Sequence, residues 1–338
     1  MTVTARVGFV GAGNVARRHV ATLLGLGDVE VAAVADPDVE RARALTARAG
    51  ASRRPGPSNA IAVYGSHLDM LEREDLDALY VCVPPFAHGP PELAAAEAGL
   101  PLFVEKPIAI DLGTADTIAA AVQRRGLVTA AGYHWRNLDT FQRALELLRE
   151  RPARLVLGCW LDKVPPVGWW CRRDGSGGQI VEQATHAIDL ARALVGEVTQ
   201  VYAAEARTER AAFPGADVND VSAATLRFAS GAVGSLSSTC LLGWKHRASV
   251  QVFGDGLALE LSEEALVVDT GSGPLARPAR GDAKVRVDRD FIDAVKGGPN
   301  RVRVPYQEAL RTHRVACALA RSAEEGRPVD LTLAGARA

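Results

Sequence analysis

The sequence predicts a two-domain protein that combines the α/β and α+β classes. The first domain is expected to be a doubly wound parallel sheet, and the second an open, mostly antiparallel sheet with flanking helices. Three observations predict this. The chain has 338 residues, 48% of them hydrophobic, which is more than one ordinary core holds. Apolar runs alternate with helix-forming stretches up to about residue 131. Beyond that point, extended runs follow one another directly.

The first domain, expected over residues 1–131, alternates between buried strands and alanine-rich helices. Alternation at this spacing is typical of right-handed βαβ units and of a parallel sheet. Residues 53–59, rich in proline and glycine, are interpreted as a loop inside this domain. The predicted strands are residues 6–10, 29–35, 78–83, 102–104 and 127–131, and the predicted helices are residues 15–24, 39–49, 91–98 and 115–125.

The second domain is expected over residues 132–338. Its long extended runs are joined by turns such as residues 229–231 and 254–256, which favours antiparallel pairing. The end of the chain, residues 288–321, returns to a helical pattern. The C-terminal helices pack either within the second domain or back on the first. The predicted strands are residues 154–161, 199–206, 221–228, 232–240, 248–253 and 257–261, and the predicted helices are residues 138–149 and 179–194.

Composition excludes several classes of function. The formal net charge of −1 leaves no electrostatic footprint for nucleic acid or an acidic membrane. No apolar run approaches the roughly 18 to 20 residues that a membrane helix needs, and the first ten residues lead straight into a strand pattern without a secretory signal. Five scattered cysteines form no CxxC pair, so we expect a cytoplasmic protein without a metal site.

The first glycine turn carries a dinucleotide fingerprint. Residues 11–16 read GAGNVA, a GxGxxA pattern between a strand and a helix. Gly11 permits the tight turn, and Gly13 lets a pyrophosphate approach the backbone. Asn14 and Val15 open the helix, whose N-terminus offers N–H groups and the positive dipole end to phosphates. These four residues are predicted to bind a dinucleotide.

Asp36 ends the second predicted strand, about 20 residues after the fingerprint, where an acid is expected to bind the ribose hydroxyls. A carboxylate there accepts hydrogen bonds from a 2′-hydroxyl and repels a 2′-phosphate. No arginine is directly adjacent, although Arg41 and Arg43 in the next helix lie within possible reach of a phosphate. The sequence therefore favours NAD over NADP.

Residues 80–108 read YVCVPPFAHGPPELAAAEAGLPLFVEKPI, a strand, a pair of prolines, a histidine, a helix, a strand and then Glu-Lys-Pro. This layout resembles the Gfo/Idh/MocA family of oxidoreductases, which includes glucose-fructose oxidoreductase and inositol dehydrogenase. The resemblance covers nearly the whole chain, including the closing helical segment from Phe291 to Gly326. It implies a Rossmann nucleotide domain followed by a domain for substrate binding and oligomerisation.

The resemblance implies that Lys106 lies beside the nicotinamide and the substrate. A cation at the carboxyl end of a parallel strand is where such sheets bind ligands, and it can stabilise a developing alkoxide. Glu105 is expected to pair with Lys106 or with the cofactor's ribose. His88 is either a cofactor contact or a helix-start residue. The residues implied to line the nicotinamide end are Cys82, Val83, Pro84 and Pro85.

A second motif, residues 177–189, reads GGQIVEQATHAID. Glu182 and His186 are four apart, which places both on one face of a helix. A carboxylate beside an imidazole orients the ring and raises its proton affinity, as a general base requires. Asp189 is the alternative orienting group. The family usually has Asp-x-x-x-His, so Glu182 is one methylene longer, and Ala184 stands where many members have glycine.

Further residues are predicted to face the substrate. The resemblance implies an arginine near the site after the first domain, and Arg136 fits it, for a hydroxyl cluster or the nicotinamide carboxamide. Asp162 can bind hydroxyls, and Trp169 and Trp170 either stack on a sugar or pack between domains.

The pattern as a whole predicts an NAD-dependent oxidoreductase that acts on a sugar, cyclic polyol or related compound. His186 takes the hydroxyl proton, Lys106 stabilises the oxygen, and Glu182 supports the histidine. Two alternatives within the resemblance are an NAD-dependent glycosidase that oxidises, eliminates and re-reduces, and a non-catalytic NAD-binding regulator. An open sheet face in the second domain would pair subunits, so we expect a homodimer or homotetramer.

Overall fold

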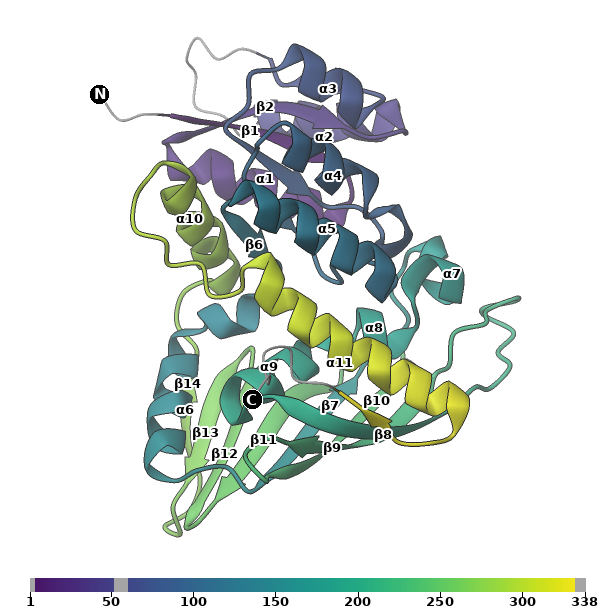
Figure 1. The fold of residues 1–338 in the computed structure, drawn as a ribbon, viewed down its shortest axis with the longest axis vertical. Helices are drawn as coiled ribbons and strands as arrows, with labels where there is room; N and C mark the ends of the chain where they lie inside the picture. The colour runs from purple at the N-terminus through teal and green to yellow at the C-terminus, as the bar shows by residue number, and fades with distance from the viewer. Residues whose placement is uncertain (1–3, 52–59, 332–338) are drawn as a thin grey trace. The chain divides into compact units, whose positions relative to one another are not determined.

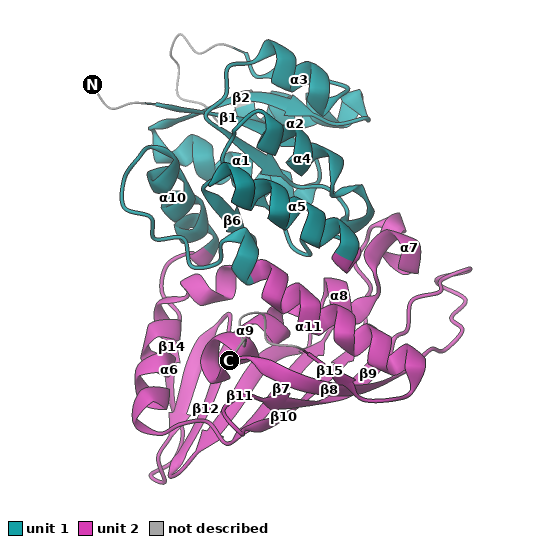
Figure 2. Cartoon of the chain, viewed as in Figure 1, with its two compact units in different colours: residues 1–109, 113–132, 284–308 teal, residues 110–112, 133–283, 309–338 magenta. Residues whose placement is uncertain are grey.

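The computed structural model describes residues 4–51 and 60–331, so the predicted loop at residues 53–59 lies outside the described residues. The chain divides into two compact units, coloured in Figure 2. Unit 1 holds residues 1–109, 113–132 and 284–308, and unit 2 holds residues 110–112, 133–283 and 309–338. Unit 1 therefore takes in a segment from late in the chain, whereas the predicted ranges were contiguous.

Unit 1 is built on a six-stranded sheet in the order β3-β2-β1-β4-β5-β6, with every pair parallel. The strand order reverses between β1 and β4, as in doubly wound sheets, which confirms the predicted class. The third strand and the helix after it were not predicted. The strands are β1 (Ala5–Val10), β2 (Val29–Ala35), β3 (Ala62–Tyr64), β4 (Ala78–Val81), β5 (Leu102–Val104) and β6 (Thr129–Ala131).

Helices cover this sheet, and the aromatic side chains Phe9, Tyr80 and Phe103 stack on one another in its core. Phe291 and Ile292 of the late segment join the same core. The helices are α1 (Asn14–Leu26), α2 (Val39–Ala51), α3 (His67–Arg73), the short η1 (Pro85–Ala87), α4 (Pro90–Glu97), α5 (Leu112–Arg125) and α10 (Ala283–Val295).

Unit 2 holds a nine-stranded sheet in the order β14-β13-β12-β11-β7-β10-β9-β8-β15. Among the described strands of this sheet, only the β7–β10 pair is parallel, which confirms the mostly antiparallel prediction. Three strands, β13 to β15, were not predicted. The strands are β7 (Leu155–Leu161), β8 (Val198–Ala206), β9 (Val221–Phe228), β10 (Val233–Thr239), β11 (Arg247–Gly254), β12 (Leu257–Ser262), β13 (Ala265–Asp269), β14 (Leu275–Pro278) and β15 (Val329–Asp330).

The helices of unit 2 gather on one face of this sheet, as Figure 1 shows for α6, α9 and α11. Side chains on the other face stay open, with Leu155 39%, Leu157 37% and Val233 51% exposed. Each described helix is too short or too polar to traverse a bilayer. The helices are η2 (His134–Asn137), α6 (Asp139–Glu150), η3 (Gly168–Cys171), α7 (Arg173–Ser176), α8 (Gln179–Glu182), α9 (Thr185–Val195) and α11 (Tyr306–Glu325).

Two helices share the helical region predicted for residues 288–321. Helix α10 ends at Val295, and Gly297 follows in the left-handed region with φ of 77°. Pro299 and Pro305 then keep the chain out of helix until α11 begins at Tyr306. The break lets α10 belong to unit 1 while most of α11 belongs to unit 2.

Candidate active site

The fingerprint turn of unit 1 is shaped by contact with β4. A Cβ built at Gly11 would lie 2.4 Å from the carbonyl oxygen of Cys82, and the φ of Gly11 is 92°, so only glycine fits there. Gly13 differs, because a Cβ built there meets no atom within 4 Å. The turn therefore presses against the strand end on one side and opens to free space at Gly13, which is the room a pyrophosphate needs.

The end of β2 and the start of α1 complete this site. The Asp36 carboxylate accepts the N–H of Ala12 at 2.8 Å and that of Asp38 at 2.9 Å, which holds it beside the turn with lone pairs to spare for hydroxyls. Helix α1 has no side-chain cap and no acid in its first turn, and Asn14 and Val15 are exposed there. These residues fit a bound dinucleotide, because the helix N-terminus is left open to anionic phosphates.

The segment after β4 runs through Val83 and Pro84 into η1, and Pro85 is buried. His88 follows and is also buried. Its Nδ1 is hydrogen-bonded to the Glu92 carboxylate, whose second oxygen accepts the N–H of Gly89 at 2.8 Å. His88 thus fills the helix-start role. Its Nε2 is buried without a partner among the described residues, which leaves one ring nitrogen available to a ligand.

The Glu105–Lys106 motif comes directly after β5 and is held by two residues that the sequence reading missed. The Glu105 carboxylate, 14% exposed, meets Nε2 of His19 at 2.9 Å through Oε1. Its Oε2 accepts the backbone N–H of Lys106 at 3.0 Å. The other ring nitrogen of His19 lies 2.7 Å from Asp288 on α10. Both oxygens of Glu105 are therefore engaged by His19 and by the backbone of Lys106, and the pairing of Glu105 with a ribose stays a prediction.

The pKa values of these groups reflect their shared burial and charge. Burial alone would lower the pKa of His19, but Asp288 and Glu105 outweigh it and raise that pKa to about 10. Burial would raise the pKa of Glu105, but hydrogen bonding to His19 lowers it below its ordinary value. Burial raises the pKa of Asp288 in spite of His19. His19 is therefore an imidazolium at neutral pH.

In unit 2, the predicted continuous helix over residues 179–194 is wrong. Helix α8 ends at Glu182 and α9 begins at Thr185. Between them the carbonyl of Gln179 accepts the N–H of Gln183 and also that of Ala184, a wider i→i+5 turn. Glu182 therefore closes one helix and His186 lies in the first turn of the next, so the two do not share an unbroken helix face.

Glu182 is half-buried and is held by a tryptophan. The Nε1–H of Trp170 donates to its Oε2 at 2.7 Å. Trp170 itself is 1% exposed and packs with Val218 and Cys240 in a small apolar cluster. Of the two alternatives for Trp170, its burial favours packing over stacking on a sugar, because its faces are covered. Trp169 is only half-buried, so its stacking role stays a prediction.

His186 is buried in a cluster of rings. The Trp160 ring on β7 and the Trp135 ring in η2 lie nearly parallel to the imidazole, with centroids 5.5 and 5.9 Å away. The rings of Tyr133 and His134 meet it edge-on at 5.9 and 5.2 Å. Four aromatic neighbours therefore fix the plane of the imidazole, which a general base requires.

Arg136 and Asp189 pair with each other, which the sequence did not predict. The guanidinium donates from Nε at 2.8 Å and from Nη2 at 2.6 Å to the two oxygens of Asp189, and the Thr312 hydroxyl donates to the same carboxylate at 2.7 Å. Because both groups are buried in this pair, it disfavours Asp189 as the group that orients His186 and Arg136 as a contact of the cofactor or substrate.

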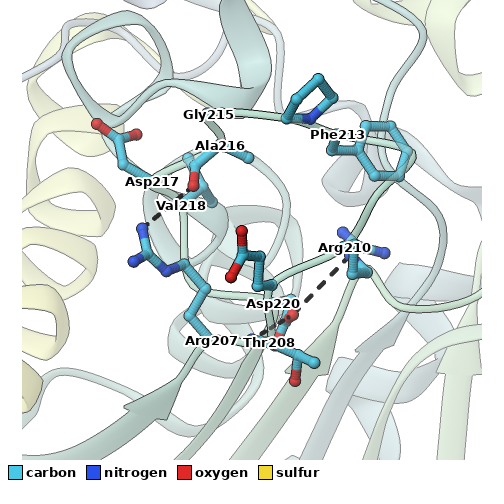
Figure 3. Close-up of a pocket in the computed structure, with 11 residues that line it drawn as sticks. Arg207, Thr208, Arg210, Phe213, Gly215, Ala216, Asp217, Val218 and Asp220 are labelled. Carbon is cyan, nitrogen blue, oxygen red and sulfur yellow. Dashed lines mark hydrogen bonds and ion pairs between the residues drawn. The ribbon is translucent and has the colours of Figure 1, made fainter.

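The remaining predicted residue and a nearby cavity lie on loops of unit 2. Asp162 follows β7 and accepts the N–H of Lys163 at 2.7 Å. The loop after β8 encloses a cavity of about 490 Å³ lined by Arg207, Arg210 and Asp220 among others (Figure 3). None of the predicted site residues lines this cavity. Its Val218, however, packs against Trp170, so the loop supports the tryptophan that holds Glu182.

Two family models match the chain. Residues 5–133 match an oxidoreductase family with an NAD-binding Rossmann fold, and residues 152–260 match the GFO/IDH/MocA C-terminal domain. The first unit therefore carries an NAD-binding domain.

Known proteins of similar length align with most of the chain. A dTDP-3,4-didehydro-2,6-dideoxy-alpha-D-glucose 3-reductase from Streptomyces antibioticus is 28% identical, over 90% of this chain and 93% of its own. An inositol 2-dehydrogenase from Rhizobium meliloti is 25% identical, over 97% and 100%. Among solved structures, a levoglucosan dehydrogenase in complex with NADH has a TM-score of 0.85 and 22% identity, over 97% and 99%, which shows a shared fold.

Proposed function

The chain belongs to the GFO/IDH/MocA family of oxidoreductases, and from that premise we propose that it transfers a hydride between NAD and a CH–OH or C=O carbon of a sugar, cyclic polyol or related compound. One observation carries the proposal. In unit 1 the fingerprint turn presses on Cys82 at the end of β4, and Glu105 and Lys106 follow the neighbouring strand β5. The fingerprint turn after β1 and the lysine after β5 thus follow the two strands that flank β4, at the carboxyl ends where such sheets bind ligands.

Each group has a role that follows from its chemistry. When bound, NAD would supply the hydride acceptor for oxidation, and NADH the hydride donor for reduction. His186, with its ring plane fixed by aromatic neighbours, takes the proton of the substrate hydroxyl. Lys106 donates a hydrogen bond to the same oxygen and stabilises its developing negative charge. Glu182, held by Trp170, supports the histidine or binds a neighbouring hydroxyl.

The residues that bind NAD in this proposal are those whose surroundings fit it. Gly11, Gly13, Asn14 and Val15 receive the pyrophosphate, and Asp36 the ribose hydroxyls. Cys82 to Pro85 and His88 border the nicotinamide end. Asp162 and Trp169 remain candidates for substrate hydroxyls and sugar C–H surfaces. The substrate class is supported by the activities of two relatives, a sugar-nucleotide reductase and an inositol dehydrogenase.

A panel of polyols and sugars, each with NAD and NADP, tests this proposal by the absorbance of the reduced cofactor. We expect turnover with NAD on at least one cyclic polyol or sugar. Lys106→Met should lower kcat by about 10² to 10³-fold, because a donor to the developing oxyanion is lost. Full turnover by K106M would contradict the assignment. Cleavage of an aryl glycoside with no net change in NADH would indicate a glycosidase instead.

We also propose that the protein works in a reducing compartment such as the cytoplasm, where its free cysteines persist.

A further proposal is that a second copy of the chain covers the open face of the nine-stranded sheet. Leu155, Leu157 and Val233 lie on neighbouring strands of that face, with Tyr202 43% exposed two strands away. Such a self-complementary apolar face suits a two-fold dimer.

Light scattering after size exclusion tests the dimer. Leu157→Glu places a charge at the centre of the face and should shift the protein toward monomers, whereas Leu275→Glu, on the edge strand β14, should not. A monomeric native protein would refute this arrangement.

A further inference from the structure

We infer that His19 is a positioning residue for Lys106, acting through Glu105 in a buried charged cluster with Asp288. The cluster joins three segments of unit 1: helix α1, the turn after β5 and helix α10. The inference rests on the proposed role of Lys106, and it concerns the residues that hold the lysine's backbone in place.

The geometry of the cluster leaves Glu105 a single arrangement. His19 meets Asp288 at 2.7 Å on one side of its ring and Glu105 at 2.9 Å on the other. The rings of Phe103 and Tyr80 wall the imidazole at centroid distances of 4.8 and 5.5 Å. A Cβ built at Gly132 would lie 2.4 Å from Oε2 of Glu105, so the carboxylate fills the space above that glycine.

The charges make this arrangement rigid. His19 carries a proton across the neutral range, because its two carboxylate neighbours outweigh the effect of burial on its pKa. An imidazolium donates from both nitrogens, so it can bond two carboxylates at the same time, whereas a neutral ring donates from only one nitrogen. Charged hydrogen bonds of this kind are shorter and stronger than neutral ones.

Stability alone does not account for three ionisable groups in one core. Buried ion pairs contribute little net stability, and apolar residues of similar volume often replace them without loss. Among the described residues, no three or more His, Cys, Asp or Glu side chains are grouped so that they could hold a metal ion, so this cluster does not have the arrangement of a metal site. What buried charges do provide is a defined arrangement of their partners, because any other arrangement leaves a charge unpaired.

The hydrogen bonds of the cluster extend to the backbone of Lys106. Oε1 of Glu105 is held by His19, and Oε2 receives the N–H of Lys106 at 3.0 Å. The N–H of Glu105 itself is bonded to Val81 at 2.9 Å, which ties the turn to the sheet. His19 therefore reaches the lysine's main chain through one carboxylate.

The first test is spectroscopic and needs no substrate. Protein labelled with ¹⁵N-histidine is titrated by NMR, with His19→Gln used to assign the His19 signals. We expect His19 to show two nitrogen-bound protons from pH 6 to beyond pH 9, with or without NADH. A neutral His19 at pH 7.5 would overturn the inference whatever the enzyme's activity.

The second test is a double-mutant cycle of wild type, H19Q, E105Q and H19Q/E105Q. We expect H19Q to lower kcat by about 10 to 100-fold, the scale of a small misplacement at a reacting centre, with less change in KM for NAD. Because His19 acts through Glu105, the H19Q substitution should have little further effect in the E105Q background. Equal losses in both backgrounds, or no loss from H19Q, would contradict the inference.

A matched control separates positioning from folding. His313 on α11 is also a fully buried histidine, and its Nε2 lies 3.3 Å from the carbonyl oxygen of Asp111. His313→Gln should lower the unfolding temperature without the same loss of kcat.

Failure of the proposed function is recognised separately. If wild type turns over no panel compound, the proposed activity fails, and the same four proteins are compared by the fluorescence of bound NADH. H19Q should then change that fluorescence only where Glu105 is present, and an equal change in both backgrounds would refute the inference.

Discussion

Glu105 of unit 1 and Glu182 of unit 2, the two glutamates among the predicted site residues, are held in opposite ways. Glu105 in unit 1 faces an imidazolium inside a cluster of three ionisable groups. Glu182 in unit 2 is half-buried and faces a neutral indole N–H, in a region where His186 is surrounded by aromatic rings. A carboxylate deep in a core needs a counter-charge, whereas a carboxylate with access to water needs only a donor to set its direction.

The comparison is tested most strongly at His186, where unit 2 is proposed to supply the reactive group itself. His186→Asn should lower kcat by about 10² to 10⁴-fold, the usual contribution of a general base, while NADH binding is retained. Its matched control is His134→Asn, which removes a neighbouring ring of the same type and should cost far less. Similar losses from both variants would mean that the ring cluster, and not the base, is what matters.

The next effect in size concerns the charged cluster of unit 1 and depends on pH. The pKa of His19 is raised to about 10, so its contribution to stability is fully present below the unfolded value of about 6.5 and is lost as pH rises toward 10. H19Q should therefore be less stable than wild type by about 3 to 5 kcal/mol near pH 6, because it leaves buried carboxylates without their counter-charge.

This gap should narrow by at most about 1.4 kcal/mol per pH unit above pH 6.5. Tyr80 and Cys82, which also face the cluster, stay neutral there, because burial raises both of their pKa values well above the ordinary range. Urea unfolding at several pH values measures the gap. A gap that stays constant from pH 6.5 to 10 would contradict the charged state of His19.

The smallest expected effect concerns the neutral donor of unit 2. Trp170→Phe keeps the ring volume in its apolar cluster but removes the N–H that binds Glu182. We expect kcat to fall by about 10-fold, the scale of one hydrogen bond to a charged group, with KM little changed. Trp169→Phe should instead raise the KM for substrate, since Trp169 is proposed to stack on it. The reverse pattern would exchange the roles of the two tryptophans.

The two regions also differ in how far sequence reasoning reaches them. Several site residues belong to short local patterns whose chemistry follows from the neighbouring residues in the sequence. They are the fingerprint, Asp36, Lys106, and the pair Glu182 and His186. The charged cluster around Glu105 cannot be predicted in this way. His19 lies 86 residues before Glu105, and Asp288, the second partner of His19, lies 269 residues after His19. No local periodicity links such positions, and only the fold brings them together.

Other errors have local causes that a pattern of apolar residues does not record. The i→i+5 turn between α8 and α9 holds one residue more than a regular helical turn. Both flanking segments still have helical character, so the sequence pattern predicts one helix. Trp170 and Arg136 carry the residue types expected of a ligand site, yet each is buried against a partner from another segment. The sequence pattern alone does not show which side chains are buried by distant segments.

The return of residues 284–308 to unit 1 has a consequence for synthesis on the ribosome. The nucleotide-binding unit cannot be completed when its six strands have emerged, because Phe291, Ile292 and Asp288 are still unmade. Until then the nascent unit holds His19 without one of its carboxylates and an apolar surface without its helix. A fragment cut after residue 132 would share that state, so we expect it to be less stable than unit 1 in the whole chain.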